Sequence, residues 1–347
     1  MRRYMWAALT LLICLTLLTG CGAGEASSSG QATAAPDGTA ERSSGVGFYF
    51  DTVVTVTLYG AEEGLLPEIW KACERYEDLL SKTVPGSDVQ RINASNGEPV
   101  TVDPETWVIL QRAKEINQLT DGAFSVTIAP LSAQWDFTHG TNRMPTDEER
   151  LAALPLVDDD KLTLGEDGTV TLPAGMEIDL GGIAKGYIAD RIAEMIRGRV
   201  HGATLSFGGN VYVVGLKPDG TAFNLGIQDP DGPTGSSIAV VQATDISLVT
   251  SGIYERYFMV GDTRYHHILD PQTGLPADSD LASASILYGS SMDADALATA
   301  CIVIGLDRAK ALLEELGRDG VFITRNGEIV TTDGFGDRVP FRVLETP

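Results

Sequence analysis

Residues 179–187, Asp-Leu-Gly-Gly-Ile-Ala-Lys-Gly-Tyr, form the most informative turn of this sequence. The apolar stretch Met176–Leu180 predicts a short strand, the paired glycines a tight turn, and residues 184–197 a helix with one apolar face. Glycines let a ligand approach the backbone, and the first turn of a helix offers free N–H groups to an anion. The turn therefore predicts an anion site beside Lys185, although an ordinary strand-to-helix turn with a solvated lysine would have the same pattern.

The segments on both sides of this turn predict an α+β fold. Hairpins next to helices favour mostly antiparallel sheets with flanking helices over a parallel sheet. Periodicity and capping residues predict helices at 65–80, 104–119, 146–154, 293–304 and 307–316. Strands are predicted at 48–59, 203–214, 222–227, 236–242, 247–250 and 283–287, with a hairpin at 256–269, two short strands around 326–327, and a polar turn at 87–93.

The N-terminus predicts export and a lipid anchor. Arg2 and Arg3 precede the apolar stretch Met5–Leu18, which is too short for a confident membrane-spanning helix. The next residues, Leu18-Thr19-Gly20-Cys21, resemble the lipobox of bacterial lipoproteins, in which the cysteine is acylated and becomes the first residue of the mature chain. We expect a signal peptide at 1–20 and an anchor at Cys21 that holds the chain on the extracytoplasmic side of a bacterial cell membrane. An ordinary secretory signal that contains a cysteine is the alternative.

Composition limits what the remainder can bind. Residues 21–45 are rich in Ser, Gly, Ala and Thr and predict a flexible tether, which leaves 46–347 as one folded domain. The net charge of the chain is −23, so nucleic acid is not an expected partner. An anionic nucleotide would need a metal ion or a cationic patch to bind here. Cys73 and Cys301 predict buried thiols, although an oxidising compartment leaves a disulfide open.

A second candidate site lies in the stretch 291–299, Ser-Met-Asp-Ala-Asp-Ala-Leu-Ala-Thr. Asp295 and Thr299 are four residues apart, so a helix places them on one face. A carboxylate and a hydroxyl are suitable ligands for a hard cation such as Mg²⁺. A capping aspartate and a threonine bonded to its own backbone would also explain the pattern.

Two further stretches contain residues suited to chemistry. In 265–274, Tyr-His-His-Ile-Leu-Asp-Pro-Gln-Thr-Gly, neighbouring histidines on a strand point to opposite faces, so only one can face a site. A histidine near Asp270 could act as general base on a hydroxyl, or the stretch could be a surface hairpin with an Asp-Pro turn. Residues 121–131 with Trp135 could form a core strand or a wall for a flat ring.

Together and in this order, these stretches resemble the FAD:protein FMN transferase (ApbE) family. The resemblance extends from Phe48 to the C-terminus. It rests on seven stretches: 87–93, 121–131, 179–190, 206–210 (Ser-Phe-Gly-Gly-Asn), 250–254 (Thr-Ser-Gly-Ile-Tyr), 267–274 and 293–299.

The resemblance implies an ApbE-like, T-fold-like domain that transfers FMN from FAD to a threonine hydroxyl of an exported target protein. The implied reaction would depend on Mg²⁺, form a phosphoester and release AMP. Family targets contain a segment such as Asp-x-x-Ser-Gly-Ala-Thr, which this chain lacks, so self-modification is not expected. The alternatives are an Mg²⁺-dependent FAD pyrophosphatase that produces FMN and AMP, and a non-enzymatic FAD-binding lipoprotein.

The resemblance also implies a set of site residues. His267 would help to activate the threonine and would contact FAD, with Asp270 close by. Two positions depart from common family patterns, because Gly182 stands where Ala, Ser or Thr is frequent, and Thr83 occupies a variable position that bears on transfer against hydrolysis. The implied metal ligands are the side chains of Asp295 and Thr299 and the backbone oxygens of Gly182 and Ala298; the implied FAD contacts are Asp179, Lys185, Ala123, Phe124 and Ser125, with Phe50 and Thr83 as weaker candidates.

Overall fold

The main sheet is built from eight strands, all paired with antiparallel neighbours. This computed structural model describes residues 40–137 and 140–344, so the predicted signal peptide and Cys21 lie outside the described residues. Across the sheet the strands follow the order β1 (Arg42–Tyr49), β2 (Thr52–Tyr59), β6 (Gly202–Phe207), β7 (Asn210–Gly215), β10 (Ile246–Gly252), β13 (Leu281–Tyr288), β14 (Asp319–Thr324) and β15 (Ile329–Thr331).

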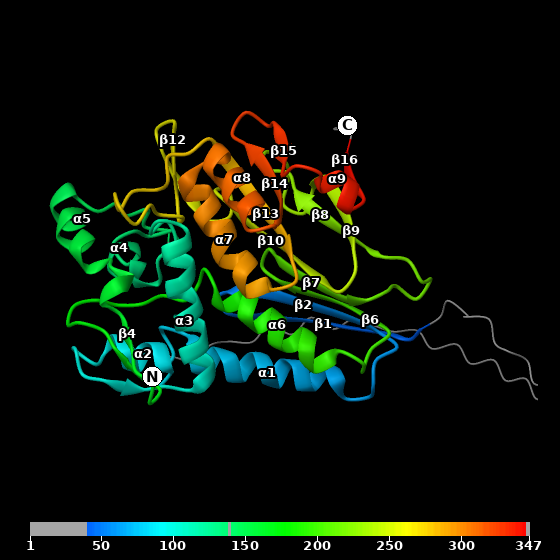
Figure 1. The fold of residues 1–347 in the computed structure, drawn as a ribbon, viewed down its shortest axis with the longest axis horizontal. Helices are drawn as coiled ribbons and strands as arrows, with labels where there is room; N and C mark the ends of the chain where they lie inside the picture. The colour runs from blue at the N-terminus through cyan, green and yellow to red at the C-terminus, as the bar shows by residue number, and fades with distance from the viewer. Residues whose placement is uncertain (1–39, 138–139, 345–347) are drawn as a thin grey trace, which may run out of the picture. The chain divides into compact units, whose positions relative to one another are not determined.

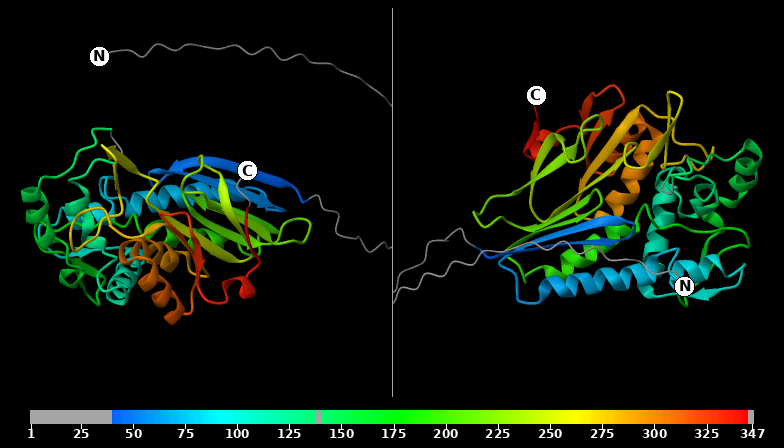
Figure 2. Two further views of the ribbon diagram at one scale, coloured as in Figure 1. Left: turned by 90° about the horizontal axis from the view of Figure 1, so that it is seen from above. Right: turned by 180° about the vertical axis from the view of Figure 1, so that it is seen from behind.

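Helices cover one face of this sheet (Figures 1 and 2). Helices α6 and α7 pack against each other, and α7 also packs against β10 and β13. The apolar faces of these helices and of the strands beneath them form the largest buried cluster of the molecule. The predicted bounds of these helices are confirmed within two residues. The helices of this layer are α1 (Leu65–Leu80), α3 (Pro104–Leu119), α6 (Ala184–Ile196), α7 (Ser291–Ile304) and α8 (Leu306–Glu315).

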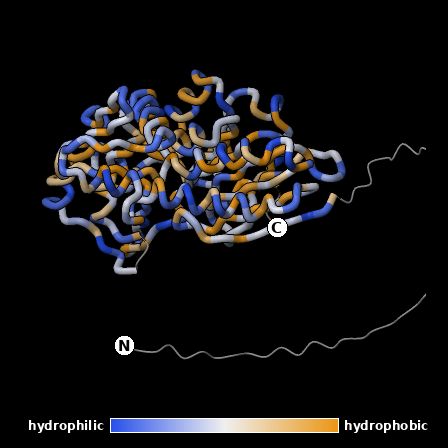
Figure 3. The backbone as a smooth tube through the Cα atoms, turned by 90° about the horizontal axis from the view of Figure 1, so that it is seen from below, coloured by the Kyte–Doolittle hydropathy of each residue, from blue (hydrophilic) through white to orange (hydrophobic). Residues whose placement is uncertain are grey.

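A second, smaller sheet covers the opposite face of the main sheet. It contains β16 (Phe341–Val343), β9 (Ser237–Ala243) and β8 (Phe223–Gln228), in that order. Apolar residues of β8 and β9 pack against Leu248 of β10 and Leu287 of β13. In Figure 3 the hydrophobic stretches run mainly through this layered interior. The predicted fold class, α+β with mostly antiparallel sheets and flanking helices, is confirmed.

Two predicted single strands were wrong, because each is a hairpin. The predicted strand 48–59 turns at Phe50 and Asp51, whose φ angles are 56° and 55°; positive φ is rare for a bulky residue such as Phe50. The turn is held by a hydrogen bond of 2.8 Å from the Phe50 N–H to Glu77 Oε1 of α1. The predicted strand 203–214 turns at Gly208 and Gly209, a more usual pair for a tight hairpin.

The start of the domain and three local predictions also need correction. Strand β1 begins at Arg42, inside the predicted tether, because its polar residues pair with β2 along the edge of the main sheet. The predicted polar turn at 87–93 is helix α2 (Asp88–Asn93), since the Ser87 side chain caps its first turn. The possible core strand at 121–131 is a loop followed by η1 (Val126–Ile128) and α4 (Ala129–Ser132). Residues 176–180, predicted as a short strand, belong to no helix or strand.

The remaining elements lie beside the layers. Thr146, the predicted cap of the helix at 146–154, does cap α5 (Asp147–Ala153), where it forms a capping box with Glu149. No helix in the described ranges is long and apolar enough to span a bilayer. Among the elements beside the layers, β3 (Val100–Thr101), β4 (Thr163–Leu164) and β5 (Thr169–Thr171) form one small sheet. A second small sheet consists of β11 (Tyr257–Val260) and β12 (Thr263–His266). The short helices are α5 (Asp147–Ala153), η2 (Leu154–Leu156), η3 (Asp159–Lys161) and α9 (Phe335–Arg338).

Candidate active site

The glycine turn at the start of α6 contacts α7. The Gly186 N–H donates a hydrogen bond of 3.0 Å to Asp295 Oδ2. Lys185 Nζ lies 3.6 Å from the same oxygen and donates a bond of 2.6 Å to the Gly181 carbonyl. A Cβ placed on Gly182 would lie 3.6 Å from Thr299 Oγ1. The structure therefore brings together the two segments that the sequence singled out separately.

The small size of Gly186 allows this contact. A Cβ at this position would lie 2.2 Å from the Ser291 carbonyl oxygen and 2.8 Å from Met292 Cα, so a larger residue would push the two helices apart. Asp190, one turn further along α6, accepts hydrogen bonds of 2.8 and 3.0 Å from the Ser291 and Met292 N–H groups. Desolvation raises the pKa of Asp190 to about 6, against the effect of these two bonds. The first turn of α7 is thus fixed to α6.

A second contact fixes α7 from the side of α3. Arg112 forms two hydrogen bonds of 2.8 Å to the two carboxylate oxygens of Asp293. Such paired bonds define direction as well as distance, because the guanidinium group is planar. The residues that follow, Asp295 and Thr299, are therefore presented from a helix held at both sides.

The oxygen atoms at this contact fit a hard divalent cation. The Asp295 side chain is 4% exposed, and Thr299 Oγ1 lies 3.2 Å from the Asp295 carbonyl and 3.3 Å from Ser251 Oγ. Ala298, fully buried, precedes Thr299 on α7. The described residues contain no cluster of three His, Cys, Asp or Glu side chains that could hold a metal, so a cation here would need backbone carbonyls as well. The ammonium group of Lys185, between the Gly181 and Asp295 oxygens, indicates that positive charge is stable at this place.

Asp179 lies at the entrance to the glycine turn and is already paired. Its carboxylate forms an ion pair of 2.5 Å with Lys82 and accepts a bond of 2.8 Å from the Gly181 N–H. Desolvation acts to raise the pKa of Asp179, but the charge and hydrogen bond of Lys82, the Gly181 N–H and the charge of Arg256 lower it below its ordinary value. Thr83, beside Lys82, is exposed. The turn therefore presents both a carboxylate and two ammonium groups.

The segment 123–127 lies against the same turn. The Phe124 ring is 3.2 Å from the position of a Gly182 Cβ, and the Asp179 N–H donates a bond of 2.8 Å to the Val126 carbonyl. Asp159, which is buried, organises the segment. Its carboxylate accepts hydrogen bonds from the hydroxyls of Ser125 and Thr127, each 2.6 Å, and from the Val126 and Thr127 N–H groups, each 3.1 Å. Ala123 and Phe124 are buried, whereas Ser125 is partly accessible.

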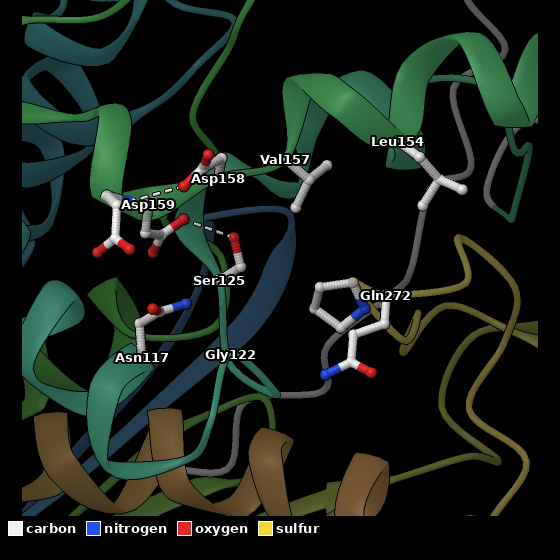
Figure 4. A pocket seen from close by; sticks show the side chains of 10 residues that line it. Asn117, Gly122, Ser125, Leu154, Val157, Asp158, Asp159 and Gln272 are labelled. Carbon is white, nitrogen blue, oxygen red and sulfur yellow. Dashed lines mark hydrogen bonds between the residues drawn. The ribbon is translucent and has the colours of Figure 1, made fainter.

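Ser125 also lines a hollow of about 320 Å³. Figure 4 shows Ser125 and Asp159 joined by a hydrogen bond on one side of it and Gln272 on another. Its other lining residues are Asn117, Gly122, Leu154, Val157, Asp158, Asp160 and Pro271. The hollow thus joins the segment 123–127 to the turn that follows the two histidines.

The two neighbouring histidines have different surroundings. His266 is buried, and its Nε2 lies 3.2 Å from the Ala277 carbonyl. The His267 N–H donates a bond of 3.0 Å to the Arg256 carbonyl, and its Nδ1 lies 3.3 Å from the same oxygen. Desolvation, and then the charges of Arg256, His266 and Lys185, lower the pKa of His267 far below its ordinary value. A neutral His267 with its proton on Nδ1 has a free lone pair on Nε2, as a general base requires.

Asp270 is bound within its own turn. Its carboxylate accepts hydrogen bonds from the Gln272 N–H (2.8 Å) and the Thr273 hydroxyl (3.0 Å), and its carbonyl accepts bonds from the next N–H groups. The hydrogen bonds of His267 go to Arg256 instead. Asp270 therefore shapes the turn beside His267, and its geometry supports a positioning role more directly than proton transfer.

Comparison with known proteins agrees with this arrangement. A model of a protein family described as the ApbE family matches residues 50–322. The chain belongs to the ApbE family. The family predicted from the seven stretches is thereby confirmed.

Individual ApbE relatives cover most of the chain. It is similar to a protein of Treponema pallidum (strain Nichols) named FAD:protein FMN transferase, with 37% identity over 81% of this chain and 82% of the relative. The solved structure of the ApbE protein from Thermotoga maritima is 31% identical, with a TM-score of 0.79 over 85% of this chain and 98% of that one. The flavin transferase ApbE from Vibrio cholerae is 28% identical, with a TM-score of 0.77 over 86% and 99%.

Several residues that shape this ApbE site were missed by sequence reasoning. Lys82 is separated by 97 positions from its partner Asp179, and no local pattern reveals such a pair. Asn93 exchanges hydrogen bonds of 3.0 and 2.8 Å with the backbone of Ile178, directly before the glycine turn. Asp159 lies in a run of three aspartates that resembles a solvated loop. Of these three residues only Asn93 had a signal in the sequence, because it lies in the stretch 87–93 that contributes to the family resemblance.

Phe50 lies at the end of the main-sheet strands that is nearest the candidate site. The hairpin turns at Phe50 and at Gly208, the C-terminal end of β10 and the start of β13 all lie at this end of the strands. Phe50 is half-buried, and its ring centroid is 6.1 Å from that of Tyr49. The Phe50 N–H bonds to Glu77 and its ring contacts Tyr49, and neither contact argues for more than the weaker role that the resemblance implies. Cys73 and Cys301, also predicted as buried thiols, are buried and free.

Proposed function

We propose that this ApbE family member transfers FMN from FAD to a threonine hydroxyl of a target protein in an Mg²⁺-dependent reaction. The threonine oxygen forms a bond to the FMN phosphorus, the pyrophosphate P–O bond breaks, and AMP leaves. The contact of the glycine turn with α7, through Gly186 and Asp295, is the observation that supports this proposal most strongly. It places anion-binding backbone next to a set of hard oxygen ligands.

The proposed metal ligands are the side chains of Asp295 and Thr299 and the backbone oxygens of Gly182 and Ala298. When bound, Mg²⁺ neutralises charge on the pyrophosphate and on the transferring phosphoryl group. Because Lys185 now pairs with Asp295, we expect its ammonium group to turn to a phosphate oxygen when FAD and the metal bind. Positive charge from the metal and from Lys185 would offset the acidity of the chain.

His267 is proposed to accept the proton of the attacking hydroxyl on Nε2. Its lowered pKa keeps it neutral near pH 7, and its bond to the Arg256 carbonyl fixes the ring. Asp179 would contact FAD at the glycine turn, with Lys82 holding its carboxylate in place. Ala123, Phe124 and Ser125 would bound the flavin, with Phe50 and Thr83 nearby as weaker contacts.

The location of the protein is a second part of the proposal. A lipid anchor at Cys21 would hold the enzyme at the extracytoplasmic face of the cell membrane and restrict it to exported targets. Mass spectrometry of the membrane-extracted chain tests this directly, because the proposal expects an acylated N-terminal Cys21 and no residues 1–20. An unmodified cysteine in a mature chain would overturn it.

One experiment separates transfer from its alternatives. The full chain in detergent is incubated with FAD, Mg²⁺ and a peptide that contains Asp-x-x-Ser-Gly-Ala-Thr with a single threonine. The proposal expects a peptide mass increased by FMN less water and an equal amount of AMP. Free FMN with AMP would indicate a pyrophosphatase. FAD binding with neither product would indicate a flavin-binding lipoprotein.

A further inference from the structure

The Nδ2 group of Asn210 is a buried donor that has no hydrogen-bond partner among the described residues. Asn210 is 1% exposed and begins β7, directly after the turn at Gly208 and Gly209. Its backbone is paired with Phe207 of β6 and Val249 of β10, and this pairing does not use the side chain. A buried amide group without a partner is rare, because only a new hydrogen bond offsets the loss of contact with water.

The side chain of Asn210 points toward the helices that cover the main sheet. Successive residues of a strand alternate between its two faces, so Asn210 shares a face with Tyr212. The Tyr212 hydroxyl lies 3.4 Å from Arg197 Nη2, at the end of α6, and 3.4 Å from the Gly289 carbonyl, just before α7. Tyr212 also belongs to the buried cluster between the sheet and these helices. The unpartnered amide therefore faces α6 and α7.

Two contacts fix the position of α7 along β10. Near the start of the helix, Ser247 Oγ donates a hydrogen bond of 2.8 Å to Ser291 Oγ. Further along the helix, Thr299 Oγ1 lies 3.3 Å from Ser251 Oγ. Asp295 is midway between Ser291 and Thr299, and the spacing of four residues places all three side chains on the face of α7 that looks toward the sheet.

The residue of β10 midway between these contacts is Val249, which is paired with Asn210. Asn210 and Asp295 therefore lie at the same level of the sheet, one on β7 and the other on the helix above β10. Gly186, which donates its N–H to Asp295 Oδ2, belongs to α6, and α6 packs against β7. The free donor of Asn210 thus faces the helix contact at which the candidate metal site is built.

We propose that Asn210 is a positioning residue for Asp295, and that its Nδ2 group donates a hydrogen bond to the Asp295 carboxylate when the metal binds. Partners of this kind orient the carboxylates that ligate metals, and their loss weakens metal binding. Lys185 Nζ now lies 3.6 Å from Asp295 Oδ2, so a neutral donor would remain beside the carboxylate once Lys185 turns to a phosphate. This inference rests on the proposed metal site and adds a residue that holds its ligand.

The test measures Mn²⁺ binding and unfolding instead of turnover. The full chain in detergent is titrated with Mn²⁺ in the presence of FAD and without acceptor, and bound Mn²⁺ is read from the loss of the free-ion EPR signal. Asn210→Leu removes the amide and keeps a side chain of similar shape. We expect its Kd for Mn²⁺ to rise about 10–100-fold. In EDTA without FAD, its urea midpoint should equal or exceed that of wild type, because the donor has no partner to lose.

Asn210→Asp gives a second signature. The substitution keeps the shape of the side chain and adds a carboxylate beside Asp295, so repulsion should lower the urea midpoint in EDTA. Mn²⁺ should then raise this midpoint by more than it raises that of wild type, because the ion offsets the added charge.

Ser283 provides a matched control on the same sheet. Its Oγ is also buried without a described partner. Ser283 lies on the opposite face of the sheet, because its neighbour Ala284 belongs to the cluster under the helices. Ser283→Ala should therefore bind Mn²⁺ like wild type.

The outcomes distinguish this inference from the proposed function. If wild type and Asp295→Asn bind Mn²⁺ equally, the metal proposal fails and the role of Asn210 fails with it. If Asp295→Asn loses Mn²⁺ but Asn210→Leu binds it like wild type, only the role of Asn210 is wrong. A urea midpoint of Asn210→Leu below that of wild type in EDTA would make Asn210 a structural residue and would also overturn the inference.

Discussion

Substitution of Gly186 by alanine tests the helix contact on which the site depends. The added Cβ would lie 2.2 Å from the Ser291 carbonyl oxygen, whereas ordinary van der Waals contact begins near 3.4 Å. Helices α6 and α7 must therefore separate by about 1 Å, because the atom that blocks the methyl group belongs to backbone. Overpacking of this kind costs about 1–3 kcal/mol of unfolding free energy. A displacement of about 1 Å at a reacting centre can reduce the rate roughly 100-fold.

Two measurements follow from this estimate. Urea unfolding of Gly186→Ala should give an unfolding free energy lower by about 1–3 kcal/mol. The value of kcat/KM for FMN attachment to the acceptor peptide should fall about 100-fold. Gly336→Ala is a suitable control, because Gly336 is also helical and a Cβ there meets nothing within 4 Å. If Gly186→Ala unfolds and reacts like Gly336→Ala, the close approach of the two helices does not support the site.

Three further substitutions test single residues. Asp295→Asn keeps an oxygen that can accept the Gly186 N–H but removes the negative charge. The value of kcat should then fall about 10²–10³-fold, and titration with Mg²⁺ should no longer stimulate the reaction. Normal stimulation by Mg²⁺ would exclude Asp295 as a metal ligand. His267→Gln should lower kcat roughly 10²–10⁴-fold with KM for FAD unchanged, whereas equal loss of FAD binding would make His267 a structural residue. Because the pKa of His267 is lowered, its neutral form persists as pH falls below 6.5, so wild-type kcat should not decline with an apparent pKa near 6.5; such a decline in a pH profile would contradict this. Lys82→Ala removes the ion pair of Asp179 and should raise KM for FAD with little change in kcat, and an unchanged KM would contradict the role of Asp179 at the glycine turn.

Local signals in the sequence predicted most helices well. The helix at 65–80 has regular apolar spacing, and the helix at 104–119 has Asp103 as cap and proline in its first turn, so both were found with the observed bounds. The hairpin at Phe50 and Asp51 was missed because a bulky residue such as Phe50 rarely adopts positive φ, and no Asn-Gly or Asp-Gly pair marks the turn. Its turn is stabilised by Glu77, a tertiary contact that no local pattern reveals.

The candidate site was only partly accessible to sequence reasoning. The helical spacing of Asp295 and Thr299 placed them on one face, and the glycines marked the turn that meets them. Their contact depends on Gly186 and Asp190 of α6, which bind the first turn of a helix a hundred residues away. The pairing of Lys82 with Asp179 and the buried carboxylate of Asp159 likewise arise only when distant segments pack together.

The position of a divalent cation tests the central proposal most directly. Crystals of the protein grown with FAD and Mn²⁺, as an anomalous scatterer in place of Mg²⁺, would locate the ion independently of any assumption about ligands. The account predicts an anomalous peak coordinated by Asp295 and Thr299 beside the Gly182 carbonyl, with the FAD pyrophosphate on the same ion and Lys185 moved away from Asp295. A bound FAD whose pyrophosphate lies elsewhere, or a peak that does not contact Asp295, would contradict it.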